Sequence, residues 1–226
     1  MSRRSHKFSL ARLGAAILAI AALSFAVTAC GSSDDTSSDA TSAADVKPVA
    51  EIDPLTGVDT QVTFDAGFAD ALTKLKVTPG PVGDATISKD GVASFPITGG
   101  NVTYYDPASP VRPYVQGVID HEGSGLSLTA GKTEVELTDF VIDPGTSELT
   151  GTVSVNGKEA ATDAVLFDLD GSTLKPLKTN ADGSATLEGT TVELSDDAAS
   201  LLNDTFGITD LQGGLVIGIS SITVAG

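Results

Sequence analysis

Few residues of this 226-residue sequence could do chemistry. After Cys30 there is one histidine, His121, and the three tyrosines, Tyr104, Tyr105 and Tyr114, all lie within 17 residues before it. Imidazole and phenol side chains both ligate haem iron in proteins. These residues leave two interpretations open. Either an imidazole and a nearby phenol form a haem site, or His121 is a sheet residue with satisfied hydrogen bonds beside half-buried sheet aromatics.

Other chemistries find less support in the residue types. A single histidine after the first thirty residues builds neither a catalytic triad nor a His-rich metal site, so we predict a protein that is not an enzyme. One cysteine excludes a disulfide framework and a cysteine-based zinc site. Asp168, Asp170 and Asp182 lie in segments that resemble fragments of calcium loops. Because Asp and Gly also supply the unusual backbone angles of turns, we predict turns there and no metal site. The alternative is a loose calcium site formed by these three carboxylates.

Cys30 belongs to a different chemistry. Four basic residues precede a charge-free apolar stretch at 13–27, which is shorter than the roughly 20 residues of a membrane-spanning helix and typical of a signal peptide. Residues 27–30, Val-Thr-Ala-Cys, resemble a bacterial lipobox, in which the cysteine receives an acyl lipid such as palmitate and the chain is cleaved before it. We predict a signal peptide at 1–29 and a lipid anchor at Cys30 that holds the protein to the outward face of the cell membrane. The alternative is an ordinary signal peptide whose cleavage site contains a cysteine.

The chain from Cys30 onward is strongly acidic. Nine basic residues face 30 acidic ones there, a balance that repels nucleic acid and excludes it as a partner. Residues 30–53 are rich in Ser, Thr, Asp and Ala and predict a disordered tether, because such a composition cannot bury enough apolar surface to offset chain entropy. The predicted partners are the lipid bilayer, through Cys30, and a ligand or another envelope protein.

Residues 54–226 predict one all-β domain that would position His121 and the tyrosines. Short β-branched and apolar runs alternate with polar residues, and turn signals recur about every ten residues, which favours an antiparallel β-sandwich or barrel. Asn156-Gly157 is the best two-residue hairpin, and residues 143–145 and 182–183 are further turns.

Two segments have helical spacing instead. Residues 65–76 place Phe68 and Leu72 on one face and have Asp65 as a plausible N-cap. Residues 195–206 have Ser195 as N-cap and acidic residues in the first turn. The sequence therefore predicts an antiparallel β-sandwich with two short α-helices.

The central part of the domain resembles the HtaA-type domain of actinobacterial surface proteins. The matching features are Gly-Val-Ile-Asp-His-Glu-Gly at 117–123, a Leu-x-Leu strand at 126–128, a valine-containing strand at 134–137, and strands around 151–153 and 166–169. Together with a looser match toward the C-terminus, the resemblance covers about half of the chain.

The resemblance implies a β-sandwich with short helices on the cell surface, whose best-described members take up haem. In them a tyrosine near the start of the domain ligates the iron, and a histidine at the position of His121 supports that tyrosine. This chain has no Trp, and residues 64–75 contain no Tyr, where the family's opening motif has both. We expect a ligand-binding module whose candidate ligand is haem, through His121 and Tyr104, Tyr105 or Tyr114. The alternative is a structural or adhesive envelope domain without a small-molecule ligand.

Overall fold

The computed structural model describes residues 46–226; the predicted signal peptide, Cys30 and most of the predicted tether lie outside these residues. Within 46–226 no helix is long and apolar enough to cross a membrane. The elements run in the order β1 (Ala50–Ile52), β2 (Gly57–Phe64), α1 (Ala66–Leu75), β3 (Thr78–Gly83), β4 (Thr86–Ile87), β5 (Val92–Pro96), β6 (Gly99–Tyr104), β7 (Val115–Ala130), β8 (Thr133–Asp143), β9 (Glu148–Val155), β10 (Lys158–Asp170), β11 (Lys178–Thr179), β12 (Ala185–Leu194), α2 (Asp196–Phe206) and β13 (Val216–Ala225).

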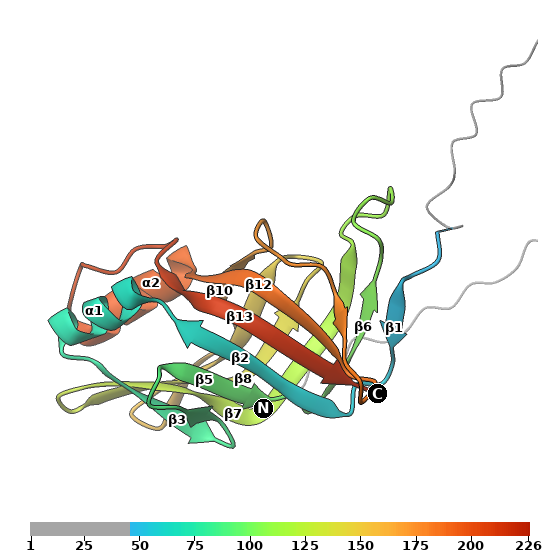
Figure 1. Cartoon of the computed structure of the whole chain (residues 1–226). Coiled ribbons are helices and arrows are strands. Elements are labelled where there is room, and N and C mark those ends of the chain that lie inside the picture. The colour runs from blue at the N-terminus through green and yellow to red at the C-terminus, as the bar shows by residue number, and fades with distance from the viewer. Residues whose placement is uncertain (1–45) are drawn as a thin grey trace, which may run out of the picture. The chain divides into compact units, whose positions relative to one another are not determined.

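The strands form one antiparallel sheet, in the order β1-β6-β7-β8-β9-β10-β12-β13-β2-β5-β4, with β11 paired to β12 and β3 to β7. The predicted all-β fold with two short helices is thus confirmed. The finer expectation of a sandwich is adjusted, because the strands belong to one continuous curled sheet rather than to two separate sheets (Figure 1).

The connection between β5 and β6 explains the curl. These strands lie near opposite ends of the strand order, yet only Ile97 and Thr98 separate them in the chain. The Thr98 amide donates to the carbonyl oxygen of Asp120 on β7 at 2.8 Å, and the Phe95 and Phe140 rings pack edge to face with centroids 5.2 Å apart. Register shifts in the β7–β8, β9–β10 and β12–β13 ladders are bulges that let long strands bend this far.

The local turn chemistry agrees with the sequence. Asn156 and Gly157 both have positive φ, 51° and 74°, as a two-residue type I′ hairpin requires, and they join β9 to β10. At 143–145 the Asp143 carboxylate accepts from the Gly145 amide at 2.7 Å. The predicted hairpin and this turn are confirmed.

Both predicted helices are present with the predicted N-caps, and both lie at one end of the sheet (Figure 1). The Asp65 side chain accepts from the Gly67 amide at 2.7 Å, and the Ser195 hydroxyl accepts from the Ala198 amide at 3.0 Å. A capping oxygen satisfies an amide that has no partner inside the helix. The helices turn Phe68, Leu72 and Leu202 into the apolar core.

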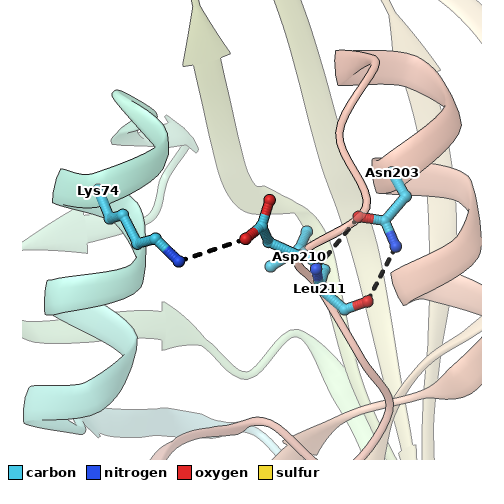
Figure 2. A network of polar contacts seen from close by, with 4 residues as sticks. All are labelled: Lys74, Asn203, Asp210 and Leu211. Atoms are coloured by element: carbon cyan, nitrogen blue, oxygen red, sulfur yellow. Dashed lines mark hydrogen bonds and ion pairs between the residues drawn. The ribbon is translucent and has the colours of Figure 1, made fainter.

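The loop after α2 is held to both helices by polar contacts (Figure 2). The Asn203 side chain donates to the Leu211 carbonyl at 2.8 Å and accepts from the Leu211 amide at 3.2 Å. Lys74 on α1 pairs with Asp210 in the same loop at 3.2 Å. We call Asn203, Asp210, Leu211 and Lys74 the helix latch, because these contacts fix the loop over the helical end of the sheet.

The ordered sheet begins earlier than the sequence indicated. Residues 50–52 form β1, which pairs with β6, and the Val49 amide donates to the Tyr104 carbonyl at 2.8 Å. The predicted tether boundary at 53 is therefore moved toward the N-terminus. The reason is that ladder hydrogen bonds are made by the backbone, so an edge strand can form from residues of tether-like composition.

Candidate functional site

His121 lies within β7 and is 1% exposed. Its Nδ1 is 3.1 Å from the carbonyl oxygen of Phe140, and its Nε2 is 2.8 Å from the Thr60 hydroxyl oxygen. A carbonyl oxygen only accepts, so Nδ1 carries the proton and Nε2 accepts from Thr60. Burial lowers the pKa of His121, against the opposing effects of the Phe140 carbonyl and Asp120, so the neutral ring is favoured. Both ring nitrogens are already used within the protein.

The tyrosines do not lie beside this imidazole. Strands β6 and β7 pair, which is the condition under which a phenol could approach His121, but the register places Tyr104 opposite Val115. Val115 precedes His121 by six positions, or roughly 20 Å along an extended strand. Next to Tyr104, the Tyr105 amide donates to the Tyr114 carbonyl at 2.7 Å, so the ladder continues away from the histidine. The structure therefore separates the four candidate haem ligands into two groups.

Tyr104 and Tyr114 line a cavity of about 230 Å³, which we call the tyrosine cavity; Tyr105 is not part of its lining. The two rings pack edge to face, with centroids 5.9 Å apart. Burial raises the pKa of the Tyr114 phenol, nearby Tyr104 adds to this, and Arg112 acts in the opposite direction. The remaining walls come mainly from the inner faces of β2, β6–β10, β12 and β13, and comprise Thr60, Val62, Val102, Pro113, Val115, Ile119, Ile142, Pro144, Ser147, Leu149, Leu169, Gly171, Leu174, Leu177, Ala185, Leu187, Thr190, Val192, Ser220, Ile222 and Val224.

The described lining is almost wholly apolar and contains no Asp, Glu, Lys, Arg or His side chain. Its few polar groups are hydroxyls. Thr60 on β2 and Ser220 on β13 are 3% and 4% exposed, and they lie on neighbouring strands in diagonal register, because Ser220 is opposite Val62. Thr60 also borders a smaller apolar void of about 40 Å³ that His121 lines as well, so Thr60 lies between the histidine and the tyrosine cavity.

No protein-family model matches this sequence, and no curated protein matches it. Among solved structures, the C-terminal domain of HtaA from Corynebacterium glutamicum aligns with a TM-score of 0.52 at 15% identity, over 76% of this chain and 97% of that one. The domain has the HtaA fold. A further match, the heme binding protein HtaB from the same organism, has a TM-score of 0.42 at 9% identity, over 78% of this chain and 96% of that one. The resemblance noted in the sequence thus extends to the three-dimensional fold.

Within this HtaA fold, the side chain that His121 supports is a threonine. The resemblance implies a tyrosine that ligates haem iron and is held by the histidine, whereas here Nε2 holds the Thr60 hydroxyl. An alkyl hydroxyl is not among the common protein ligands of haem iron. Of the candidate haem ligands in the sequence, only the phenols of Tyr104 and Tyr114 line the tyrosine cavity.

Thr60 and His121 also form a hydroxyl–imidazole pair, which the sequence did not reveal. Such a pair can activate a nucleophile when a third group orients the base, and the Phe140 carbonyl holds Nδ1 here. Acyl transfer further needs free N–H groups aimed at the developing oxyanion. β2 is paired to β13 on one side and to β5 on the other, so the backbone around Thr60 lies within ladders on both edges. The pair is therefore better suited to fixing a hydroxyl than to catalysis.

Of the three aspartates considered for calcium, Asp170 and Asp182 serve turns, whereas Asp168 lies within β10 and is paired with Glu148 and Glu193. Asp170 accepts from the amide and the hydroxyl of Ser172, both at 2.8 Å, and Asp182 accepts from the amide and the hydroxyl of Ser184, at 3.0 and 2.7 Å. These hydrogen bonds lower the pKa of both carboxyl groups. Within residues 46–226 no group of three or more His, Cys, Asp or Glu side chains is arranged to hold a metal ion.

Thr60 and Ser220 are the residues that sequence reasoning missed. They could have been found from the alternation of inward and outward positions along their strands. On β2 the inward positions run Thr60, Val62, Phe64, and on β13 they run Ser220, Ile222, Val224. A hydroxyl at an inward position interrupts an otherwise apolar stripe, and buried hydroxyls need a partner.

Proposed function

We propose that this chain is a non-enzymatic, ligand-binding lipoprotein of the cell envelope whose domain takes the apolar part of a small molecule into the tyrosine cavity. The observation that carries the proposal is the cavity itself: about 230 Å³ of apolar space inside a sheet whose other end is filled. A void of this size in a close-packed interior forgoes contacts that a ligand would supply. Apolar pockets with few polar groups are typical small-molecule sites.

The envelope location rests on the sequence of residues 1–30. The lipobox at 27–30 supports acylation of Cys30, and the absence of any other cysteine makes the assignment testable without ambiguity. Cells that express the chain with radiolabelled palmitate should label it in the membrane fraction, and Cys30→Ser should abolish the label. Labelling that persists in Cys30→Ser would overturn the anchor.

Haem is the specific ligand that the resemblance implies. In this chain it requires a phenol from Tyr104 or Tyr114, because His121 has both ring nitrogens engaged. When bound, haem would supply its redox-active iron, and the chain's part would be to ligate it, cover its faces and exclude water.

Two titrations of the purified full chain in mild detergent test the proposal. One follows the visible spectrum with haemin, and the other follows the fluorescence of N-phenyl-1-naphthylamine, an uncharged apolar probe. Saturable probe binding at one site, weakened by Leu187→Trp in the cavity wall, supports the tyrosine cavity as a ligand site. Tyr105→Phe is the matched control for Tyr104→Phe and Tyr114→Phe, because Tyr105 does not line the cavity.

The possible results of the two titrations support different functions. A haemin Soret band that is lost in Tyr104→Phe or Tyr114→Phe and kept in Tyr105→Phe identifies a haem carrier. Probe binding without a protein-specific haemin spectrum identifies a module for another apolar ligand. Binding of neither compound by the folded chain overturns the proposal and favours the structural or adhesive envelope domain.

A further inference from the structure

The two buried aliphatic hydroxyls of the tyrosine cavity have different hydrogen-bonding capacities. The Thr60 hydroxyl donates its one proton to Nε2 of His121. Nε2 cannot donate, because the ring proton is on Nδ1, which donates to the Phe140 carbonyl. The Thr60 oxygen therefore has only acceptor capacity left to offer to a ligand in the cavity that Thr60 lines. This assignment depends on the carbonyl at Nδ1, which fixes the tautomer of His121.

Ser220 has the opposite capacity. No hydrogen bond joins its hydroxyl to another described residue, although the side chain is 4% exposed and lines the cavity. Among the described residues, every side-chain oxygen that is fully buried has a hydrogen-bond partner. Because the Ser220 oxygen has no such partner, it is not fully buried, and a small molecule in the cavity can reach it. Ser220 is thus a free donor, one strand away from an acceptor.

We propose that the polar floor formed by Thr60 and Ser220 recognises an alcohol, and that the ligand class of the tyrosine cavity is an uncharged lipophilic alcohol. The ligand hydroxyl donates to Thr60 and accepts from Ser220, while its hydrocarbon part lies against the aliphatic walls. This inference rests on the proposed function, since it selects the ligand class of the same cavity.

Head groups that only accept hydrogen bonds, or that carry a charge, leave one floor position or the charge unmatched. An ether or ester oxygen only accepts, so it serves Ser220 and leaves the Thr60 oxygen without a donor. A carboxylate or phosphate also only accepts when ionised, and it would place a charge in a cavity whose described lining has no cationic side chain. An ammonium would be equally unpaired, because no carboxylate lines the cavity. A hydroxyl both donates and accepts, so it can serve Thr60 and Ser220 together.

The closing experiment measures displacement of N-phenyl-1-naphthylamine from the full chain by three ligands with the same hydrocarbon chain: 1-decanol, its methyl ether and decanoate. We expect 1-decanol to bind about three- to tenfold more tightly than the ether, which is the range that one net hydrogen bond supports. Decanoate is expected to bind most weakly.

Variants locate this preference. Ser220→Ala and Thr60→Val should reduce the alcohol-to-ether ratio toward one, while Thr60→Ser should retain it because it keeps the hydroxyl. Thr63→Val is the matched control, since Thr63 lies on β2 with its side chain exposed on the outer face. If Thr60→Val does not fold, Ser220→Ala carries the test alone, because Ser220 supports no other described side chain.

Failure of the alcohol class and failure of the ligand site give different results. Probe binding with equal affinities for the three ligands, or with decanoate binding best, overturns the alcohol assignment and leaves the apolar ligand site intact. Retention of the alcohol preference in Ser220→Ala also overturns it. Absence of probe binding by the folded chain overturns both.

Discussion

Both ends of the curled sheet enclose largely apolar interiors, but they fill them differently. At the helical end, α1, α2 and the loop 207–215 cover the sheet, and the space left between them is about 30 Å³. The other end contains the tyrosine cavity, and we call it the tyrosine end. No residue of α1 or α2 lines this cavity, and about 230 Å³ remains open between mainly aliphatic walls. The difference shows that strand side chains alone do not fill a sheet curled this far, and that the two helices supply the missing volume at one end only.

The same contrast appears in the polar groups. At the helical end, polar side chains hold the backbone in place. In the helix latch, the Asn203 side chain bonds to the Leu211 backbone, and Lys74 bonds to Asp210. The tyrosine end keeps a Ser220 hydroxyl without a partner among the described residues. One end is therefore arranged for stability, whereas the other retains space and hydrogen-bonding capacity.

The largest expected effect compares one truncation at each end. Leu202→Ala removes a side chain that is 3% exposed and enclosed by the core, and it should lower the free energy of unfolding by about 2–5 kcal/mol. Leu187→Ala in the half-buried wall of the tyrosine cavity should cost less than half as much, because that side chain already borders empty space. Urea unfolding followed by circular dichroism measures both. Equal losses would show that the two ends are packed alike.

The helix latch provides the next test. Asn203→Ala leaves the amide and carbonyl of Leu211 without partners, and it should cost about 1–3 kcal/mol. Hydrogen exchange should accelerate in the loop 207–215 and stay unchanged in β6 and around Tyr114. Ser200→Ala, an exposed position on the same helix, is the control. Equal acceleration at the tyrosine end would mean that the ends are not independent.

His121 lies between the two ends, and its protonation should make the free energy of unfolding depend on pH. Its pKa is lowered in the folded chain, so the unfolded chain binds the proton more readily below its ordinary pKa of about 6.5. The contribution of the neutral His121 ring to the free energy of unfolding is fully present above that pH. It is lost as the pH falls, by at most about 1.4 kcal/mol per pH unit. Urea unfolding between pH 7.5 and 5 should show this slope, and His121→Gln, although less stable, should lack it. A stability that rises on acidification would contradict the buried neutral imidazole.

The smallest effect is expected at Lys74 and Asp210. Their side chains are 75% and 50% exposed, so the ion pair should contribute less than about 1 kcal/mol and fade in high salt. A double-mutant cycle of Lys74→Ala and Asp210→Ala at low and high salt measures it. A coupling that persists in high salt would assign this pair a larger part in closing the helical end.

Local features of the domain were predictable from the sequence. Both helices begin at the predicted caps, Asp65 and Ser195, because a capping oxygen and a 3.6-residue period act within a few neighbouring residues. The Asn156-Gly157 hairpin was predictable for the same reason, since positive φ at two successive positions is a local demand. The all-β class is encoded in the two-residue alternation along most of the domain.

Only the tertiary structure decided where these elements meet. Whether the strands form a sandwich or one curled sheet depends on bulges and on the β5–β6 connection, which alternation does not encode. His121 and Thr60 are 61 positions apart, and their contact depends on strands far apart in the sheet order. The register of β6 on β7 likewise separates Tyr104 from His121, although the two lie close in the chain. The sequence by itself determined the elements and the residue types, because these act locally, whereas long-range pairing and register brought a threonine and a serine to the floor of the tyrosine cavity.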